Sequence, residues 1–146
     1  MQRTIRKKKI IKKPIQEVWE AISNENSIAK WFMEGKFTAE DGAVFEFMDT
    51  PGIKWKGVFQ GEILSAQEPI NLAFSWVHSK LNHTTYVWWK LEDINGNTRI
   101  ELEHSGFKGY SDVISSYSYG FFWDGRLKNL VKYLDTNPVI SKRSEM

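Results

Sequence analysis

Between residues 42 and 104 the chain alternates apolar and polar side chains with a period of two in five successive runs. Successive side chains of a β-strand point to opposite faces, so each run predicts a strand with one buried face. Turn residues separate the runs, and Asn95-Gly96 suits a tight hairpin because both residues tolerate a positive φ. The pattern predicts a meander of antiparallel strands at residues 42–48, 53–64, 71–77, 84–93 and 97–104.

Helical spacing flanks this meander on both sides. Residues 4–12 predict a sixth strand, and residues 14–22 predict an amphipathic helix with apolar side chains at i, i+3, i+4 and i+7. Ser27 is expected to cap a second short helix. After the strands, residues 116–135 return to helical spacing and predict a long closing helix. We therefore expect an α+β fold in which this helix lies across a curved six-stranded antiparallel sheet.

Length and composition narrow the class of protein. The chain of 146 residues suits one domain, which we place at residues 1–136, followed by a polar C-terminal tail at 137–146. It has no cysteine, which excludes disulfides and thiolate chemistry and is typical of a reducing compartment. No apolar run approaches the roughly 20 residues that span a bilayer, and no signal peptide is apparent. We expect a cytoplasmic protein without a membrane span.

The basic residues are concentrated at the N-terminus. Seven of the 20 Lys and Arg lie between Arg3 and Lys13. Such an arm could bind nucleic acid or an anionic membrane, because phosphate contacts dominate that kind of binding. Lysines also protect the edge strand of a sheet against association with another strand. We favour the edge strand and expect no nucleic-acid partner, because one short basic strand is a poor electrostatic footprint.

Several local motifs occur in a characteristic order over about residues 3–135. They are Pro14 with Val18-Trp19, Trp31-Phe32, Gly61-Glu62-Ile63-Leu64, Trp76, "GNTRIELEHSGF" and "WDGRLKNLVKYL". Their order and spacing resemble the helix-grip fold of the START and Bet v allergen-like (SRPBCC) superfamily. Within it the chain resembles the family similar to the C-terminal domain of the activator of Hsp90 ATPase. The resemblance implies a cavity between the concave sheet and the long helix, where superfamily members hold apolar ligands.

Bulky side chains are expected to line this cavity. The alternation along the strands and the spacing along the helices predict that ten side chains point into the cavity: Trp31, Phe45, Phe47, Phe59, Phe74, Trp76, Trp89, Tyr117, Phe121 and Trp123. Rigid rings pack a concave surface less completely than aliphatic chains, which favours a ligand-sized space. The alternative is that the rings simply fill the core, since aromatic residues at core spacing are more often packing than pocket.

Two polar residues share the inward side. Lys9 lies on the Ile5 and Ile11 side of the first strand, where it would need an acidic partner, an anionic ligand group or a route to the rim. His104 could bind a ligand or act as a base, but at a strand end it is more often structural. His78 and His83 are too loosely spaced for a metal site. We expect no metal, no cofactor and no catalytic residue.

Two aromatic residues point the other way. Tyr86 and Trp88 alternate with the inward Trp89, so they are expected on the convex face, with Trp55 nearby. Exposed aromatic patches tend to mark contacts with a partner, here a second copy of the chain or a client protein.

Three functions remain open at this stage. The leading interpretation is a non-enzymatic binding protein for an apolar or amphipathic, lipid-like molecule, with a link to stress. The alternative is a co-chaperone-like domain that contacts an Hsp90-type chaperone, which the resemblance implies. A cyclase or hydrolase ranks lowest, because no base in the sequence is visibly paired with an orienting group.

Overall fold

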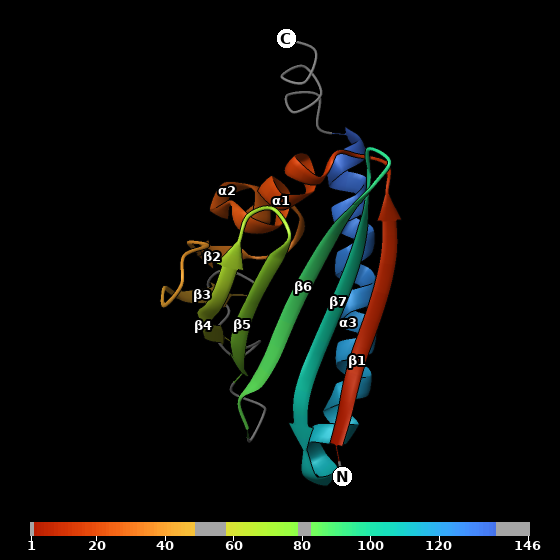
Figure 1. Ribbon diagram of the computed structural model, residues 1–146. Coiled ribbons are helices and arrows are strands. Elements are labelled where there is room, and N and C mark those ends of the chain that lie inside the picture. Colours follow the sequence, from red (N-terminus) through yellow and green to blue (C-terminus); the bar gives the residue numbers. More distant parts are fainter. Residues whose placement is uncertain (1, 49–57, 79–82, 137–146) are drawn as a thin grey trace.

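The computed structural model describes residues 2–48, 58–78 and 83–136, which form one seven-stranded sheet, two short helices and one long helix. Figure 1 shows the long helix running beside the sheet, with the short helices across one end. In chain order the elements are β1 (Gln2–Ile11), α1 (Ile15–Ser23), α2 (Glu25–Trp31), β2 (Glu34–Lys36), β3 (Val44–Met48), β4 (Val58–Gln67), β5 (Asn71–His78), β6 (Thr85–Ile94), β7 (Asn97–Lys108) and α3 (Gly109–Thr136).

The sheet is antiparallel throughout, in the order β1-β7-β6-β5-β4-β3-β2. The predicted α+β class and curved antiparallel sheet are confirmed, with one strand more than expected. The extra strand is β2, whose three residues are all exposed and too few to show an alternation. The basic strand β1 lies at the opposite edge, as its lysines indicated.

Two helix starts differ from the sequence prediction. Asn24, not Ser27, caps α2, because its side chain accepts a hydrogen bond from the Ser27 backbone N–H at 3.1 Å. α3 begins at Gly109, seven residues before the predicted start at 116. The extra helical turns follow directly after β7, and Gly109 at the junction takes φ +76°. The serines of this segment weakened its helical pattern in the sequence.

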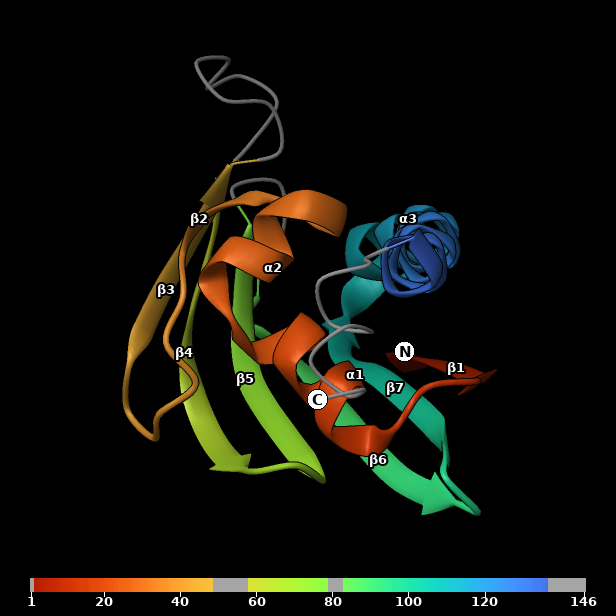
Figure 2. The same ribbon diagram turned by 90° about the horizontal axis from the view of Figure 1, so that it is seen from above.

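The helices cover different parts of the concave face. α3 packs against β1 and β7, while α1 lies against β6 and β7 and α2 against β2. Viewed from above, the sheet curves around α2 while α3 stands over the β7 side (Figure 2). Trp89 is 3% exposed and points into the space between these layers, whereas Trp88 on the opposite face is 42% exposed. The alternation of the β6 sequence therefore predicted its buried face correctly.

One glycine permits the tight bend of β4 against its neighbours. A Cβ atom added to Gly61 would overlap the carbonyl oxygen of Ser75 on β5 and lie 2.6 Å from Cζ of Phe45 on β3. The missing side chain thus lets the Phe45 ring lie directly on the β4 backbone. In contrast, a Cβ atom on Gly120 of α3 would meet no heavy atom within 4 Å.

We predict opposite effects of alanine at these two glycines. Gly61→Ala should lower the free energy of unfolding by about 3 kcal/mol, because it overpacks a closed contact between strands. Gly120→Ala should raise it by about 0.5–1 kcal/mol, because alanine favours the helix and has room there. Urea unfolding of the two variants measures both changes. An unchanged midpoint for Gly61→Ala would contradict the packing described for β4.

Candidate functional site

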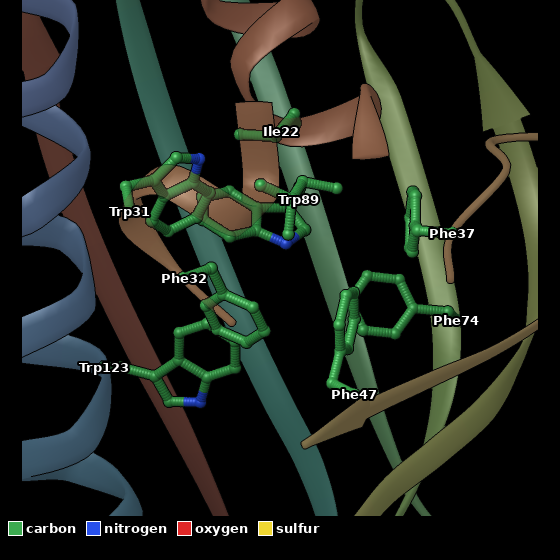
Figure 3. A pocket seen from close by; sticks show the side chains of 9 residues that line it. Ile22, Trp31, Phe32, Phe37, Phe47, Phe74, Trp89 and Trp123 are labelled. Carbon is green, nitrogen blue, oxygen red and sulfur yellow. The ribbon is translucent and has the colours of Figure 1, made fainter. Parts of the chain in front are cut away.

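An apolar pocket lies between α2, α3 and the concave face of the sheet (Figure 3). Side chains from both short helices, the segment after β2, three strands and α3 meet there. All nine lining residues are apolar or aromatic: Ile22, Ile28, Trp31, Phe32, Phe37, Phe47, Phe74, Trp89 and Trp123. No lining residue carries a charge, so the pocket favours neutral, apolar contents.

The unfilled space in this pocket is small. Its volume is about 20 Å³, which is room for roughly one water molecule. Pockets that hold drug-sized ligands measure about 300 Å³ or more. The expected ligand-sized space is therefore not met in this conformation, because the aromatic side chains fill most of the interior themselves.

The Phe32 side chain forms the wall of the pocket next to Trp123 (Figure 3). Its ring stacks on Trp123 with a centroid distance of 5.7 Å and an interplanar angle of 17°, and it meets Phe47 and Phe122 edge to face. Phe32 follows the last residue of α2 and is 9% exposed, the most exposed residue of the described apolar core.

A hydrogen-bonded chain runs beside the pocket and joins α3 to three strands. Trp123 Nε1 donates to His104 Nδ1 at 3.0 Å, so the proton of the neutral imidazole lies on Nε2. His104 Nε2 then donates to Thr85 Oγ1 at 2.8 Å, and this hydroxyl donates to the carbonyl oxygen of Trp76 at 3.1 Å. The chain therefore crosses from α3 through β7 and β6 to β5 with every proton assigned.

A second hydrogen-bonded chain starts from the ring of Trp76. Its Nε1 donates to the hydroxyl of Tyr119 at 3.0 Å, and this hydroxyl lies 3.3 Å from Nδ1 of His78. Burial raises the pKa of Tyr119 to about 12, although the hydrogen bond from Trp76 opposes the shift. Tyr119 therefore stays protonated and acts as a hydrogen-bond bridge.

His104 has the geometry of a structural residue. Its side chain is fully buried, both ring nitrogens are engaged, and burial lowers its pKa from 6.5 to about 3. A general base must reach a substrate proton, and His104 could do so only by breaking its bonds to Thr85 or Trp123. The arrangement positions α3 against the sheet rather than moving a proton.

A comparison with protein families identifies the family of this chain. The family described as "Activator of Hsp90 ATPase homolog 1-like protein" matches residues 12–135. The chain belongs to this family. The resemblance drawn from the sequence motifs is thereby confirmed, together with the helix-grip architecture of the activator of Hsp90 ATPase homologues.

Solved structures share this architecture. Protein MLL2253 from Mesorhizobium loti has a TM-score of 0.81 at 23% identity, with 92% of this chain and 99% of that chain covered. Protein BH1534 from Bacillus halodurans has a TM-score of 0.75 at 25% identity, with 92% of this chain and 99% of that chain covered. The Aha1 dimer from Colwellia psychrerythraea has a TM-score of 0.74 at 17% identity, with 92% of this chain and 97% of that chain covered. None of the curated proteins compared with the chain matches it.

Within this family fold, most of the predicted cavity residues are gathered at the site. Five of them line the pocket: Trp31, Phe47, Phe74, Trp89 and Trp123. Three more, Phe45, Phe59 and Trp76, are buried in the ring cluster beside it. His104 is buried too, but its contacts are the hydrogen bonds described above.

Three predicted cavity residues lie elsewhere. Tyr117 and Phe121 are 59% and 79% exposed, because they are two positions away from the buried Tyr119 and Trp123 and so fall on the opposite side of α3. Lys9 is exposed on the edge strand β1 rather than buried over the cavity. At a sheet edge an inward-facing lysine reaches water directly.

Sequence reasoning also missed residues of the pocket. Phe32 belonged to the predicted apolar stripe of the second helix, and that stripe was the signal for it. Phe37 lies in no periodic segment, and its backbone N–H donates to the Glu25 carboxylate at 2.8 Å. Only the folded chain brings Phe37 to the pocket.

The predicted convex patch is exposed but partly covered by its own neighbours. Tyr86 is 46% and Trp88 is 42% exposed. Lys90 Nζ lies 3.8 Å above the Trp88 ring, and Trp88 Nε1 donates to Asn71. Trp55, expected nearby, lies outside the described residues.

Within residues 2–48, 58–78 and 83–136, no three or more His, Cys, Asp or Glu side chains are grouped so that they could hold a metal ion. No helix in the same ranges is both long and apolar enough to cross a membrane.

We predict a pH dependence of stability from His104. Its pKa is depressed in the folded state, so between about pH 3 and 6.5 only the unfolded chain binds the proton. Stability should therefore be complete above pH 6.5 and fall as the pH drops towards 3, by at most about 1.4 kcal/mol per pH unit.

The variant His104→Gln separates this effect from that of the carboxylates. Glutamine does not titrate. Between about pH 4 and 6.5, which lies inside the window set by the folded and unfolded pKa values of His104, the free energy of unfolding of the variant should therefore change less with pH than that of the parent, whatever its absolute value. Urea unfolding at several pH values measures both slopes. Equal slopes would contradict the assignment of a neutral buried imidazole.

Proposed function

We propose that the chain binds a neutral, flat, apolar small molecule in this pocket, that the ligand displaces the Phe32 ring from Trp123, and that no reaction is catalysed. The observation that carries this proposal is a pocket with nine apolar or aromatic lining residues, in which the Phe32 ring stacks on the Trp123 ring. A ligand of similar shape would replace the ring-on-ring contact that Phe32 gives up.

The two sides of the pocket are held in place in different ways. Phe37, Phe45, Phe47 and Phe74 contact one another through their rings, which have no hydrogen-bonding group to hold them in place. On the other side, Trp123 is fixed by His104. The pocket thus has one wall anchored by hydrogen bonds and one wall of rings held by packing alone.

The lining also narrows the chemistry of the ligand. Three indole rings, of Trp31, Trp89 and Trp123, offer faces and edges to an aromatic guest, and such contacts add about 0.5–1.5 kcal/mol each beyond area burial. No lining side chain could pair with a charged group, and the guanidinium of Arg126 lies outside the lining, 5.7 Å from the Phe32 ring centroid. We therefore favour neutral aromatic compounds over anionic lipids.

Naphthalene is a suitable probe, with naphthalene-2-sulfonate as its charged counterpart. Naphthalene should quench tryptophan fluorescence and raise the melting temperature, because ligand that binds only the folded state stabilises it. The variant Phe32→Leu should bind naphthalene about tenfold more tightly, since less side chain has to leave the pocket. The sulfonate should bind neither protein.

Phe107→Leu provides the matched control. Phe107 is fully buried and its ring contacts His104 and Tyr119, away from the pocket lining. The same truncation there should destabilise the fold by a similar amount, about 1–3 kcal/mol, without changing the affinity for naphthalene. If neither the parent nor Phe32→Leu responds to naphthalene, the pocket is only a packed core and the proposal fails.

A second candidate function is association with an Hsp90-type chaperone, favoured by the family to which the chain belongs. Its support is the family description and the likeness to the Aha1 dimer in fold. Purified Hsp90 should then be retained by the immobilised chain, and its ATPase rate should change on addition of the chain. No retention and an unchanged ATPase rate would exclude this function.

A further inference from the structure

The N-terminal half of α3 carries a row of exposed apolar side chains. Tyr110, Ile114, Tyr117 and Phe121 are 74%, 59%, 59% and 79% exposed. Their spacings of four, three and four residues place them on one line along the helix, the arrangement of the contact seam in helix pairs. We call these four residues the α3 stripe. All four members are more exposed than Tyr86 and Trp88 of the convex patch.

The helix segment that carries the α3 stripe has almost no charged residues of its own, and the nearest charged groups are Arg3 against Tyr117 and Asp124, which pairs with Lys7. Between Gly109 and Trp123 the only ionisable acid or base is Asp112, apart from the tyrosines, and Asp112 is 1% exposed. Ser111 and Ser118 flank the stripe on one side and Gly120 lies on the other. These small neighbours allow a second helix to approach closely.

The stripe is also supported from below. The Arg3 guanidinium lies 3.8 Å from the centroid of the Tyr117 ring, and its Nη1 donates to Ser116 Oγ at 3.1 Å. This contact fixes an aromatic ring at the centre of the stripe while more than half of its surface stays open to solvent. A side chain held in advance loses little entropy when a partner covers it.

We propose that the α3 stripe is the contact surface of a symmetric dimer of this chain, in which two α3 helices pack antiparallel. The four positions are self-complementary about a two-fold axis between residues 115 and 116. Tyr110 then faces Phe121 of the partner subunit, and Ile114 faces Tyr117 of the partner subunit. Both members of such a contact are neutral, which matches the lack of charge on the stripe.

The area of the stripe fits a second copy at moderate affinity. An aromatic side chain presents about 150–250 Å² in full, so the four exposed groups offer roughly 400–500 Å² per copy. Two copies would bury about 900 Å², slightly less than the roughly 1,000 Å² of a stable specific interface, so the dimer is expected to be weak and to depend on concentration. Membrane-surface helices, by comparison, carry Lys and Arg along the polar face, and residues 109–123 have none.

Sedimentation velocity of the full chain over roughly a hundredfold range of concentration tests the dimer. We expect a monomer at the low end and a dimer at the high end. Either Ile114→Lys or Phe121→Lys should raise the protein concentration at which half of the chains are dimeric by at least about tenfold. Tyr86→Lys on the convex face should leave this concentration unchanged. Circular dichroism confirms that these exposed substitutions leave the fold intact.

Three results would overturn the proposal. They are a monomer at every concentration, a dimer that responds to Tyr86→Lys but not to Ile114→Lys, and a monomer whose stripe binds anionic phosphatidylserine vesicles instead. None of these results bears on naphthalene binding, so the pocket and the α3 stripe are tested separately.

The absence of cysteine makes the antiparallel register testable. A mixture of Tyr110→Cys and Phe121→Cys chains should form a disulfide-linked heterodimer under mild oxidation, because the two positions face each other. Either variant alone should not, since its two cysteines would lie about 16 Å apart along the helix axis. Equal cross-linking of each variant alone would indicate a parallel or random contact and overturn the register.

Discussion

The hydrogen-bonded chain from Trp123 through His104 and Thr85 to Trp76 is the interaction on which the rest of the interior depends. It is buried, and each donor in it has one acceptor, so the imidazole is held in a single tautomer. Loss of any member would leave a polar atom without a partner in an apolar surrounding, which costs about 1–3 kcal/mol. This series of hydrogen bonds therefore fixes the distance of α3 from the sheet, and with it the position of Trp123 in the pocket.

This anchoring gives the interior two kinds of packing. Trp76, Trp123 and Tyr119 combine ring contacts with directed hydrogen bonds. The phenylalanines around Phe32 are held by ring contacts, together with the Arg126 guanidinium beside Phe32. The first kind specifies one geometry, and the second tolerates exchange of one ring for another of similar size. A family fold that hosts many functions can vary its pocket through the second kind without losing the first.

The sequence predicted the sheet well because its strands have one buried and one exposed face. Trp89 inside and Trp88 outside follow from period two alone. It predicted the helix faces less well, since Tyr117 and Phe121 are as apolar as core residues and nothing in their type marks them as exposed. Phe37 and β2 were missed because neither belongs to a repeating pattern. The nearly filled pocket could not be predicted, because packing density depends on how rings from distant segments meet.

Both margins of the sheet are poor templates for another strand. β1 presents lysine and arginine side chains, and β2 ends the other margin after three residues. Growth by strand addition, which has no natural end point, is thereby discouraged at either side. A contact between two identical helical surfaces is instead closed, since each copy uses up its only such surface within residues 109–123. The architecture thus separates finite pairing from open-ended aggregation.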